Sequence, residues 1–319
     1  MGRMADIYDM VIIGGGAAGF TAGIYAARDR CQALLLERVA AGGQVLNCEH
    51  IENYPGFPDG VAGYTLGPLL QQQAMQLGLG LRLADVEAVR LEGELKVLQT
   101  GAGDIRTRAL IIATGSSFTP LGVPGEEAFL GRGVSHCAAC DGAMFMAQPV
   151  AVIGGGDAAL DEALYLTQYA SQVTIVHRRD TLRACRLLQE RAQANKKLTF
   201  RWNTVVRAIA GEDVVQRLQV EEVKTGAQST LEVAGVFPYL GLTPNTQFLN
   251  DLVPLNARGQ ILTDLWLRTA VPGVLAAGDV RGDSARQLIA AAGDGATAAL
   301  AAIRYLRTGQ WRDGNAEAL

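Results

Sequence analysis

The feature that most constrains the fold of this chain is a pattern that occurs twice in the sequence. Residues 10–16 read Met-Val-Ile-Ile-Gly-Gly-Gly, and residues 150–156 read Val-Ala-Val-Ile-Gly-Gly-Gly. Each begins as a short apolar run without alternation, which is typical of a parallel strand buried on both faces. An alanine-rich segment follows each glycine turn and leads into a second apolar strand. The predicted helices are 17–28 and 157–170, and the second strands are 33–36 and 173–176. The repeated strand, glycine turn, helix and strand predict an α/β fold with two Rossmann-like dinucleotide-binding domains.

The length and composition of the chain agree with two such domains. A chain of 319 residues is longer than a domain with a single hydrophobic core usually is, and its 38 glycines suit many tight turns. The net charge of −4 provides no global positive field, so we expect neither nucleic acid nor an anionic membrane as a partner. No apolar run approaches the roughly 18 residues that span a bilayer. Met1 to Asp9 carries two aspartates and no signal-peptide pattern, which predicts a soluble, cytoplasmic protein.

Two stretches rich in turn-forming residues mark where the chain is expected to pass between the domains. One lies near 114–125 and the other near 241–247. The chain then continues into an apolar strand at 273–278 and a long alanine-rich helix at 285–306. If this last section packs on the first domain, the second domain is an insertion in the first.

The first glycine loop has the context that a nucleotide fingerprint requires. Gly14, Gly16 and Gly19 follow a strand and open a helix, so backbone N–H groups can face a pyrophosphate at close range. Glu37 ends the next strand, 18 residues after Gly19. An acid there accepts hydrogen bonds from both ribose hydroxyls of an adenosine without a 2′-phosphate. These residues predict a site for FAD, and a glycine-rich turn beside a solvated glutamate is the alternative.

The second glycine loop differs from the first at the end of the following strand. It reads Gly154-x-Gly156-x-x-Ala159, a variant of the same fingerprint. The strand has no acid at its end, and the cationic side chains there are His177, Arg178, Arg179 and Arg183. Arginine makes charge-assisted, bidentate hydrogen bonds to phosphate oxygens, whereas an acid would repel a 2′-phosphate. We therefore expect NADPH at this loop, and a solvated surface cluster is the alternative.

A close cysteine pair lies between the two fingerprints. The spacing of Cys137 and Cys140 lets two thiols close a small disulfide ring and lowers the pKa of the first thiol. A zinc site would need a second ligand pair, so we expect no metal. We predict a redox-active disulfide, and two buried structural thiols are the alternative. The other cysteines, predicted to be buried thiols, are Cys31, Cys48 and Cys185.

Two polar residues flank the cysteine pair. Asp141 can act as a general acid beside the dithiol if burial raises its pKa, and aspartate also favours the N-cap of a helix. His136 either tunes a thiolate or only packs.

Together these residues resemble the bacterial-type, low-molecular-weight thioredoxin reductases, from Val11 to about Arg307. The motifs that carry the resemblance are Gly14-Gly-Gly-Ala-Ala-Gly19, Gly42-Gly-Gln44, Glu52-Asn-Tyr-Pro-Gly56, Ala113-Thr-Gly115, Cys137-Ala-Ala-Cys-Asp141, Gly154-Gly-Gly-Asp-Ala-Ala159, His177-Arg-Arg179 with Arg183, and Ala277-Gly-Asp279 followed by Arg286-Gln287. The resemblance implies an FAD domain of residues 1–117 and 247–319, with a three-layer ββα architecture. It implies an NADPH domain of residues 118–246 inserted in the first, and a homodimer.

The resemblance also implies the residues that line each cofactor. For FAD they are Gly14, Gly16, Ala17, Ala18, Gly19, Glu37, Arg38, Gly42, Gly43, Gln44, Asn53, Ala113, Thr114, Gly115, Gly278, Asp279, Arg286, Gln287 and Leu288. Asp279 is implied to contact the ribityl chain. For NADPH they are Gly154, Gly156, Asp157, Ala158, His177, Arg178, Arg179 and Arg183.

The implied activity passes electrons from NADPH through FAD to Cys137 and Cys140, and then to the disulfide of thioredoxin. Cys140 is implied to lie nearest the flavin, Cys137 to attack thioredoxin, and Asp141 to be the acid.

Three positions depart from the family pattern, and one of them is His136 before the cysteine pair. Pro238 falls where such chains have an uninterrupted strand. Trp311 either stacks on the flavin of another subunit or belongs to a frayed tail, and we expect the frayed tail.

Other functions remain open for this fold. A flavin reductase without dithiol chemistry would lack the cysteine pair. A disulfide reductase could take electrons from ferredoxin, although the arginines after the second loop favour NADPH. A dithiol oxidase would run the reaction backwards, and a redox-sensing binding module would not turn over.

Overall fold

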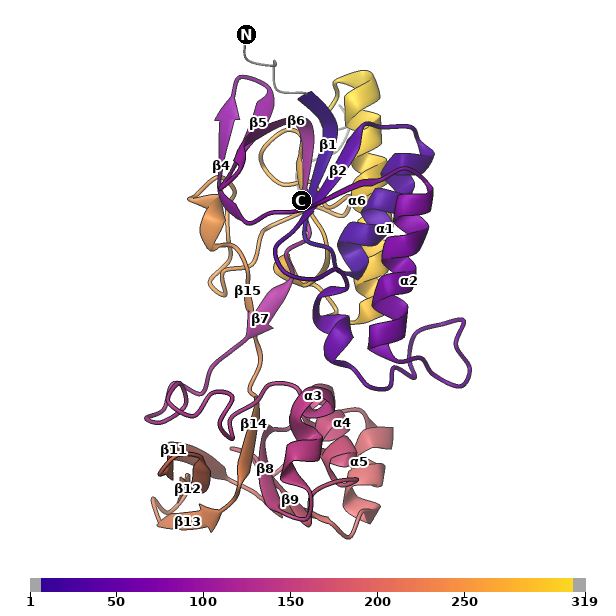
Figure 1. The fold of residues 1–319 in the computed structure, drawn as a ribbon. Helices are drawn as coiled ribbons and strands as arrows, with labels where there is room; N and C mark the ends of the chain where they lie inside the picture. The colour runs from indigo at the N-terminus through magenta and orange to yellow at the C-terminus, as the bar shows by residue number, and fades with distance from the viewer. Residues whose placement is uncertain (1–6, 312–319) are drawn as a thin grey trace. The chain divides into compact units, whose positions relative to one another are not determined.

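The structure of the chain, a computed structural model, describes residues 7–311. The chain forms two compact units (Figure 1). One unit extends to Ser117 and resumes at Thr243, and the other is Phe118–Leu242. Residues 1–6 and 312–319, which the predicted domain ranges include, lie outside the described residues. No helix in the described part of the chain is long and apolar enough to cross a bilayer.

The first unit is built on a seven-stranded sheet in the order β3-β2-β1-β6-β5-β4, with β16 paired to β6. Its strands are β1 (Ile7–Ile13), β2 (Ala33–Glu37), β3 (Gly80–Leu83), β4 (Val86–Glu92), β5 (Leu95–Thr100), β6 (Gly103–Ile112) and β16 (Val274–Ala276). β3, β2, β1, β6 and β16 run parallel, whereas β4 and β5 pair antiparallel. Ile12, Leu35 and Ile111 are fully buried, as the continuous apolar runs predict.

Three helices pack together against one face of this sheet (Figure 1). They are α1 (Ala17–Arg28), α2 (Gly63–Gln76) and α6 (Leu288–Thr308). α1 has the predicted bounds, but α6 begins three residues later than predicted. Arg286 has φ 52°, a left-handed conformation that an α-helix does not contain, and its N–H donates to Ser284 Oγ at 3.2 Å. Gly309, with φ 68°, ends α6.

Lys96 on β5 is a buried cation, although lysine is rarely buried without a carboxylate partner. It is only 2% exposed. Its Nζ donates to the carbonyl oxygens of Glu94 at 2.9 Å and Arg108 at 3.0 Å, near the ring of Tyr305. Burial lowers the pKa of Lys96 from 10.5 to about 8.

This shift predicts a pH dependence of stability. Between the folded value of about 8 and the unfolded value of 10.5, the unfolded chain binds more protons at Lys96 than the folded chain does. The free energy of unfolding contributed by this group should therefore rise with pH across that window. Urea unfolding of the wild type and of Lys96→Met, followed by circular dichroism at several pH values, measures the difference. Equal pH slopes in the two proteins would contradict the prediction.

The second unit contains a parallel four-stranded sheet in the order β10-β9-β8-β14. The strands are β8 (Pro149–Gly154), β9 (Gln172–Val176), β10 (Leu198–Arg201) and β14 (Gly235–Tyr239). The helices α4 (Asp157–Leu166) and α5 (Arg186–Ala194) belong to the core of this sheet. A separate antiparallel sheet is formed by β11 (Thr204–Gly211), β12 (Val215–Glu222) and β13 (Gln228–Glu232).

Two details of this unit differ from expectation. α4 ends at Leu166 rather than at 170, and Lys197 Nζ caps the turns that follow by donating to the carbonyls of Thr167 (2.8 Å) and Ala170 (3.0 Å). Pro238 lies inside β14 without interrupting it. β14 is at the end of its sheet, and its outer side has only an isolated bridge to Val134, where the Val236 N–H donates to the Gly133 carbonyl at 2.8 Å. A proline at 238 is tolerated because no full strand pairs with β14 on that side.

The two chain crossings pair with each other. β7 (Ser116–Phe118) and β15 (Leu242–Pro244) form a two-stranded sheet. Asn245 fastens the crossings, since its Nδ2 donates to the Thr114 carbonyl at 2.9 Å and its Oδ1 accepts from Ser117 Oγ at 2.8 Å. The Thr114 hydroxyl donates to the Asn245 carbonyl at 2.8 Å.

The prediction that Trp311 is frayed is wrong. Its indole N–H donates to the Thr269 carbonyl at 3.3 Å, and its ring meets Tyr305 edge to face with centroids 5.2 Å apart. Arg268 Nη1 donates to the Trp311 carbonyl at 2.8 Å. Trp311 therefore has a satisfied N–H and packs, partly buried, against the core of the first unit.

Candidate functional site

The residues predicted to bind the first dinucleotide lie on loops that follow neighbouring parallel strands. Gly14–Gly19 follows β1, Arg38–Gln44 follows β2, Ala113–Gly115 follows β6, and Gly278–Asp279 comes shortly after β16. These strands are adjacent in the order β2-β1-β6-β16, so their carboxyl ends share one edge of the sheet. Ligands of open α/β sheets bind at that edge. The fold thus brings four predicted segments together.

Close backbone approaches explain the glycines of the first loop. Gly14 has φ 105°, and a Cβ there would lie 2.3 Å from the Ala113 carbonyl oxygen. A Cβ at Gly19 would lie 1.8 Å from the carbonyl oxygen of Gly14. Gly16 is different, because a Cβ there would meet nothing within 4 Å. It is the N-cap of α1, whose first residues Ala17 and Ala18 are buried, and no side chain caps this helix.

The space beside Gly16 fits a pyrophosphate. The first N–H groups of an α-helix have no intrahelical acceptor, and here no side chain takes them. Because no protein atom lies within 4 Å of where a Gly16 Cβ would be, an anion can approach the helix N-terminus and accept these hydrogen bonds.

Glu37 is held against the same loop. Its Oε2 accepts from the N–H of Gly15 at 2.7 Å, and its Oε1 accepts from the N–H of Val39 at 3.0 Å. A carboxylate oxygen has more than one lone pair, so both oxygens keep capacity to accept ribose hydroxyls. Arg38 is exposed beside it.

The turn at Gly42 and Gly43 completes one side of the loop. The N–H of Gly42 donates to the Gly15 carbonyl at 2.7 Å, and a Cβ at Gly43 would lie 3.1 Å from Gly16 Cα. Gln44 Nε2 donates to the Ser116 carbonyl at 3.0 Å.

Asn53 lies near the start of α6. Its Nδ2 donates to Gln287 Oε1 at 3.1 Å, and Gln287 is the residue directly before Leu288. Asn53 is therefore a neighbour in the fold of two predicted cofactor contacts, Gln287 and Leu288, although Gln287 lies 234 residues later in the sequence.

Asp279 lies in the short 3-10 helix η4 (Gly278–Val280). Burial raises the pKa of its carboxyl, and a hydrogen bond from Ser284 Oγ at 3.2 Å opposes that rise. Asp294 on α6 holds this segment in place. It accepts from the N–H of Gly278 at 2.9 Å and forms a two-point ion pair with Arg281, at 2.6 and 2.9 Å.

The second glycine loop repeats the geometry of the first. A Cβ at Gly154 would lie 2.6 Å from the Tyr239 carbonyl oxygen, whereas a Cβ at Gly156 would meet nothing within 4 Å. Gly156 is the N-cap of α4, which no side chain caps. Asp157 and Ala158 begin α4, and Asp157 Oδ1 accepts from the N–H of Cys185 at 2.7 Å.

His177 occupies the position at the second loop that Glu37 occupies at the first. A Cβ on Gly155 would lie 2.5 Å from its ring, much as one on Gly15 would lie 3.2 Å from Glu37 Oε2. The ring is buried and its Nε2 lies 3.0 Å from the Thr181 carbonyl. Burial and the nearby arginines lower the pKa of His177, so the neutral ring predominates at pH 7.

The other predicted cations face solvent. Arg178, Arg179 and Arg183 are all exposed, and none forms an ion pair with a carboxylate of residues 7–311. The backbone N–H of Arg183 donates to the Gly155 carbonyl at 2.7 Å, which places the arginines beside the loop. Unpaired guanidinium groups at this place suit a phosphate.

Cys137 and Cys140 form a disulfide, with their Cα atoms 5.3 Å apart. The prediction of a bonded pair is confirmed. Cys137 is the N-cap of α3 (Ala138–Asp141), and its Sγ accepts from the N–H of Cys140 at 3.2 Å. Cys140 is exposed and Cys137 is half-buried, so the disulfide is open to a reaction partner.

Sequence reasoning missed two residues that hold this site. Glu162 on α4 accepts from the N–H of Ala138 at 2.9 Å, and Ser135 Oγ accepts from the N–H of Cys137 at 3.1 Å. Asp141 is the N-cap residue of the short 3-10 helix Gly142–Phe145, but its side chain makes no cap hydrogen bond, and the N-cap of α3 is Cys137. His136 packs, with its ring stacked on Phe118 at 5.4 Å and Nδ1 3.2 Å from the Pro238 carbonyl.

The remaining cysteines are not buried as predicted. Cys48 and Cys185 are exposed, and Cys31 is half-buried. Burial and the neighbouring Asp29 raise the pKa of Cys31. Within residues 7–311, no group of three or more His, Cys, Asp or Glu side chains is arranged to hold a metal ion.

Comparison with known proteins identifies the family. Residues 8–296 match the family described as pyridine nucleotide-disulphide oxidoreductase. The chain belongs to this family. A thioredoxin reductase of Mycolicibacterium smegmatis is 42% identical over 96% of this chain and 99% of that protein. One of Listeria monocytogenes is 44% identical over 96% of both. The crystal structure of Lactococcus lactis thioredoxin reductase in its FR conformation superposes with a TM-score of 0.92, at 43% identity over 94% of this chain and 99% of that one.

These matches confirm the resemblance and the fold class predicted from the sequence. The chain is an oxidoreductase with two Rossmann-like domains and a redox-active cysteine pair. Membership in the family implies the use of a flavin and a pyridine nucleotide.

Proposed function

We propose that this chain is a thioredoxin reductase that transfers electrons from NADPH to FAD, to the Cys137–Cys140 disulfide, and then to the disulfide of thioredoxin. The observation that carries the proposal is the exposed Cys137–Cys140 disulfide in a chain that also has two glycine loops of matching geometry. The relatives named thioredoxin reductase cover almost the whole chain, and the family match at residues 8–296 includes every residue of the implied machinery.

Different residues of the chain hold the two cofactors. The glycine loop at Gly14–Gly19 and Glu37 hold FAD, and the loop at Gly154–Ala159 with the three exposed arginines holds NADPH. When bound, FAD would supply the two-electron transfer between the nicotinamide and the disulfide, which the side chains that hold the cofactors cannot supply. Residues 1–117 and 247–319 form the FAD domain, and residues 118–246 form the NADPH domain.

The disulfide completes the transfer by thiol chemistry. Two electrons and two protons reduce it to two thiols, and the thiolate of Cys137 attacks a sulfur of the partner's disulfide. The thiolate of Cys140 then attacks Cys137 in the mixed disulfide, which releases the reduced partner and restores the disulfide. We assign Cys140 to the flavin side and Asp141 to proton transfer at the departing thiolate.

An anaerobic titration with NADPH tests the proposal. Each chain should take up four electrons, two on the flavin and two on the disulfide. The uptake is measured from the visible absorbance bands of the flavin. Thioredoxin from a bacterium should then be reduced with turnover. Uptake of only two electrons, or purified protein without a flavin spectrum, would show the proposal to be wrong.

The two kinds of glycine in the first loop give a second prediction. Gly19→Ala places a Cβ 1.8 Å from a backbone oxygen, so we expect a loss of stability of about 2 kcal/mol together with loss of FAD. Gly16→Ala meets no protein atom, so it should fold as the wild type does but bind FAD about tenfold more weakly or worse. Urea unfolding of the apoprotein measures the stability of each variant, and the flavin content after dilution measures its retention of FAD. FAD retention by Gly16→Ala equal to the wild type would place the pyrophosphate elsewhere.

A donor other than NADPH is the main alternative. Ferredoxin-linked reduction or a dithiol oxidase of the same fold would need no phosphate-binding arginines, whereas Arg178, Arg179 and Arg183 are exposed beside the second loop. Reduction of the flavin by NADPH at a rate that supports turnover excludes both.

We further propose a homodimer and a cytoplasmic location, where a reducing pool keeps Cys31, Cys48 and Cys185 as thiols. Sedimentation at micromolar protein concentration tests whether the protein is a homodimer.

A further inference from the structure

The segment that carries the arginines of the second loop has no regular secondary structure. It runs from the end of β9 at Val176 to the start of α5 at Arg186. Within it, Arg178, Arg179 and Arg183 are exposed. Like charges this close repel one another, which disfavours a compact loop. An irregular segment of this kind presents its arginines at a fixed place only if other groups hold its backbone.

Three successive backbone N–H groups fasten this segment to the second glycine loop. The N–H groups of Arg183 and Ala184 both donate to the Gly155 carbonyl, at 2.7 and 3.2 Å. The next N–H, that of Cys185, donates to Asp157 Oδ1 at 2.7 Å. This third bond is the charge-assisted one, because its acceptor is a carboxylate. Asp157 is half-buried at the first position of α4, directly after the glycines.

At the first glycine loop, the position that corresponds to Asp157 is an alanine. There the Gly15 carbonyl accepts from the N–H of Gly42 at 2.7 Å, which repeats the backbone bond of the second loop. The first helical residue is Ala17, whose methyl group cannot accept a hydrogen bond. The carboxylate is therefore an addition at the loop whose following segment carries the arginines.

Asp157 lies where an acid opposes the binding of an anion. In the proposed function the N-terminus of α4 faces the phosphates of NADPH, and a carboxylate in the first turn repels them. A carboxylate that contacted the ligand would weaken binding. One that is bonded to the Cys185 N–H can instead favour binding, because it fixes the arginines that attract the phosphate.

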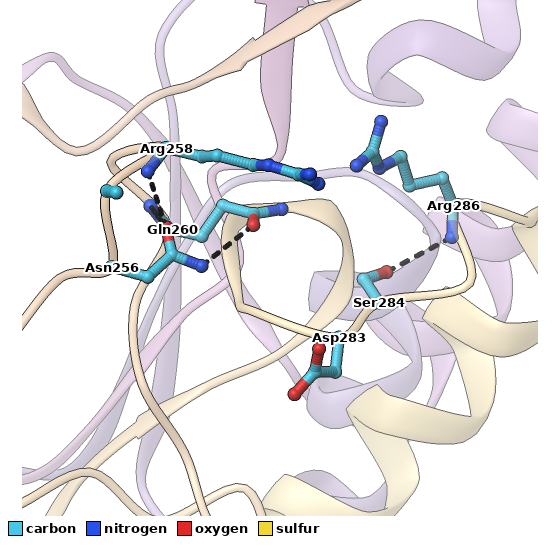
Figure 2. A pocket seen from close by; sticks show the side chains of 7 residues that line it. Asn256, Arg258, Gln260, Asp283, Ser284 and Arg286 are labelled. Atoms are coloured by element: carbon cyan, nitrogen blue, oxygen red, sulfur yellow. Dashed lines mark hydrogen bonds between the residues drawn. The ribbon is translucent and has the colours of Figure 1, made fainter.

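A side-chain oxygen also fixes an arginine-bearing loop of the first unit, but only through a local bond. Figure 2 shows the loop at 283–286, where Ser284 Oγ accepts from the Arg286 N–H at 3.2 Å. On the facing turn, Asn256 Oδ1 accepts from the Arg258 N–H at 2.9 Å. Each bond joins residues two apart, whereas the bond from the Cys185 N–H spans 28 residues. The place of the arginine segment relative to its glycine loop therefore depends on a distant partner.

We propose that Asp157 is a positioning residue, which holds the arginine segment against the second glycine loop and so sets the preference for a nucleotide with a 2′-phosphate. This inference rests on the proposed function, in which NADPH binds at the second loop. Fixed donors bind an anion more tightly than mobile ones, because less conformational entropy is lost on binding. Without the carboxylate, the attraction for the 2′-phosphate should fall, while the glycine loop keeps its affinity for the rest of the nucleotide.

Limited digestion with trypsin tests the position of the segment without any nucleotide. Trypsin cleaves after arginine where the chain opens locally. Asp157→Ala should be cut within residues 178–186 about fivefold or more faster than the wild type, because a hydrogen bond that closes the segment is lost. Asp157→Asn keeps a side-chain oxygen for the Cys185 N–H and should be cut more slowly than Asp157→Ala. Mass spectrometry of the fragments identifies the cleaved bonds.

Calorimetry with 2′,5′-ADP and 5′-AMP tests the effect on nucleotide choice. Asp157→Ala should bind 2′,5′-ADP about tenfold more weakly than the wild type, whereas its affinity for 5′-AMP should not fall. Asp157→Asn should recover most of the affinity for 2′,5′-ADP that Asp157→Ala loses. Glu190→Ala removes an exposed acid of α5 and is the matched control, so its affinities and its cleavage rate should be those of the wild type.

The inference is overturned if Asp157→Ala is cleaved at the wild-type rate or binds 2′,5′-ADP as the wild type does. It is also overturned if both nucleotides lose affinity equally, or if Asp157→Asn loses as much as Asp157→Ala. Should Asp157→Ala not fold, as judged by circular dichroism, Asp157→Ser replaces it, because its hydroxyl is one bond shorter than the carboxylate. A wild type that does not bind 2′,5′-ADP contradicts the proposed function instead, and the cleavage rates still show whether Asp157 holds the segment.

Discussion

Replacing Cys140 with serine should abolish thioredoxin reduction while leaving the flavin reducible by NADPH. The variant has no disulfide to accept the second electron pair, so anaerobic uptake should fall from four electrons per chain to two. The steady-state rate of thioredoxin reduction should drop by about 10³-fold or more. The two cysteines react as a pair, so removing one of them removes nearly the whole rate.

The two cysteines should differ in what they trap. In Cys140→Ser, the thiol of Cys137 can still attack oxidised thioredoxin, but no second thiol resolves the product. A mixed disulfide should therefore accumulate and appear as a covalent complex by mass spectrometry without reductant. Cys137→Ser should be equally inactive but form no such complex. The matched control is Cys185→Ser, which removes an exposed thiol outside the pair and should keep full turnover. Trapping by Cys137→Ser instead would reverse the roles proposed for the two sulfurs.

Local patterns in the sequence predicted the dinucleotide folds because each pattern is enforced by nearby atoms. Gly14 and Gly19 must be glycine, since a side chain at either would overlap a backbone oxygen. The apolar runs of β1 and β2 are buried on both faces, so their sequence shows no alternation. The bounds of α1 were predicted correctly for the same reason, because they too are set by local features of the sequence. The errors at the end of α4 and at the start of α6 arose where hydrogen bonds to side chains override local helix propensity: Lys197 donates to the Thr167 carbonyl, and Ser284 accepts from the Arg286 N–H.

Contacts between residues far apart in sequence were not predictable in this way. Asn245 fastens Thr114 and Ser117 across 131 and 128 residues, and nothing in the Thr-Pro-Asn stretch indicates that partner. Glu162 reaches the helix that carries the cysteines only because α4 packs beside it. Trp311 near the end of the chain was expected to fray, but the Thr269 carbonyl that it bonds lies 42 residues earlier. Such pairings depend on tertiary packing that periodicity does not encode.

Removing the arginines after the second loop should change the choice of nucleotide. Arg178→Ala with Arg179→Ala should lower kcat/KM for NADPH by about 100-fold or more, because each charge-assisted hydrogen bond to phosphate contributes about 1.5–3 kcal/mol. The value for NADH should stay within about twofold, since NADH has no 2′-phosphate for the guanidinium groups to bind. Arg179→Lys should fall between, since an ammonium keeps the charge but not the planar fork.

The neighbouring His177 explains why the effect should be specific to the phosphate. Its ring fills the position where Glu37 stands at the first loop, and its lowered pKa keeps it neutral at pH 7. It therefore brings no negative charge against a 2′-phosphate, and the arginines supply the attraction. Calorimetry with 2′,5′-ADP and 5′-AMP measures how much the 2′-phosphate contributes to binding, separately from catalysis. Only 2′,5′-ADP should lose affinity in the double variant, with Arg217→Ala as the matched control. Equal losses for the two ligands would mean that the arginines hold the loop and not the phosphate.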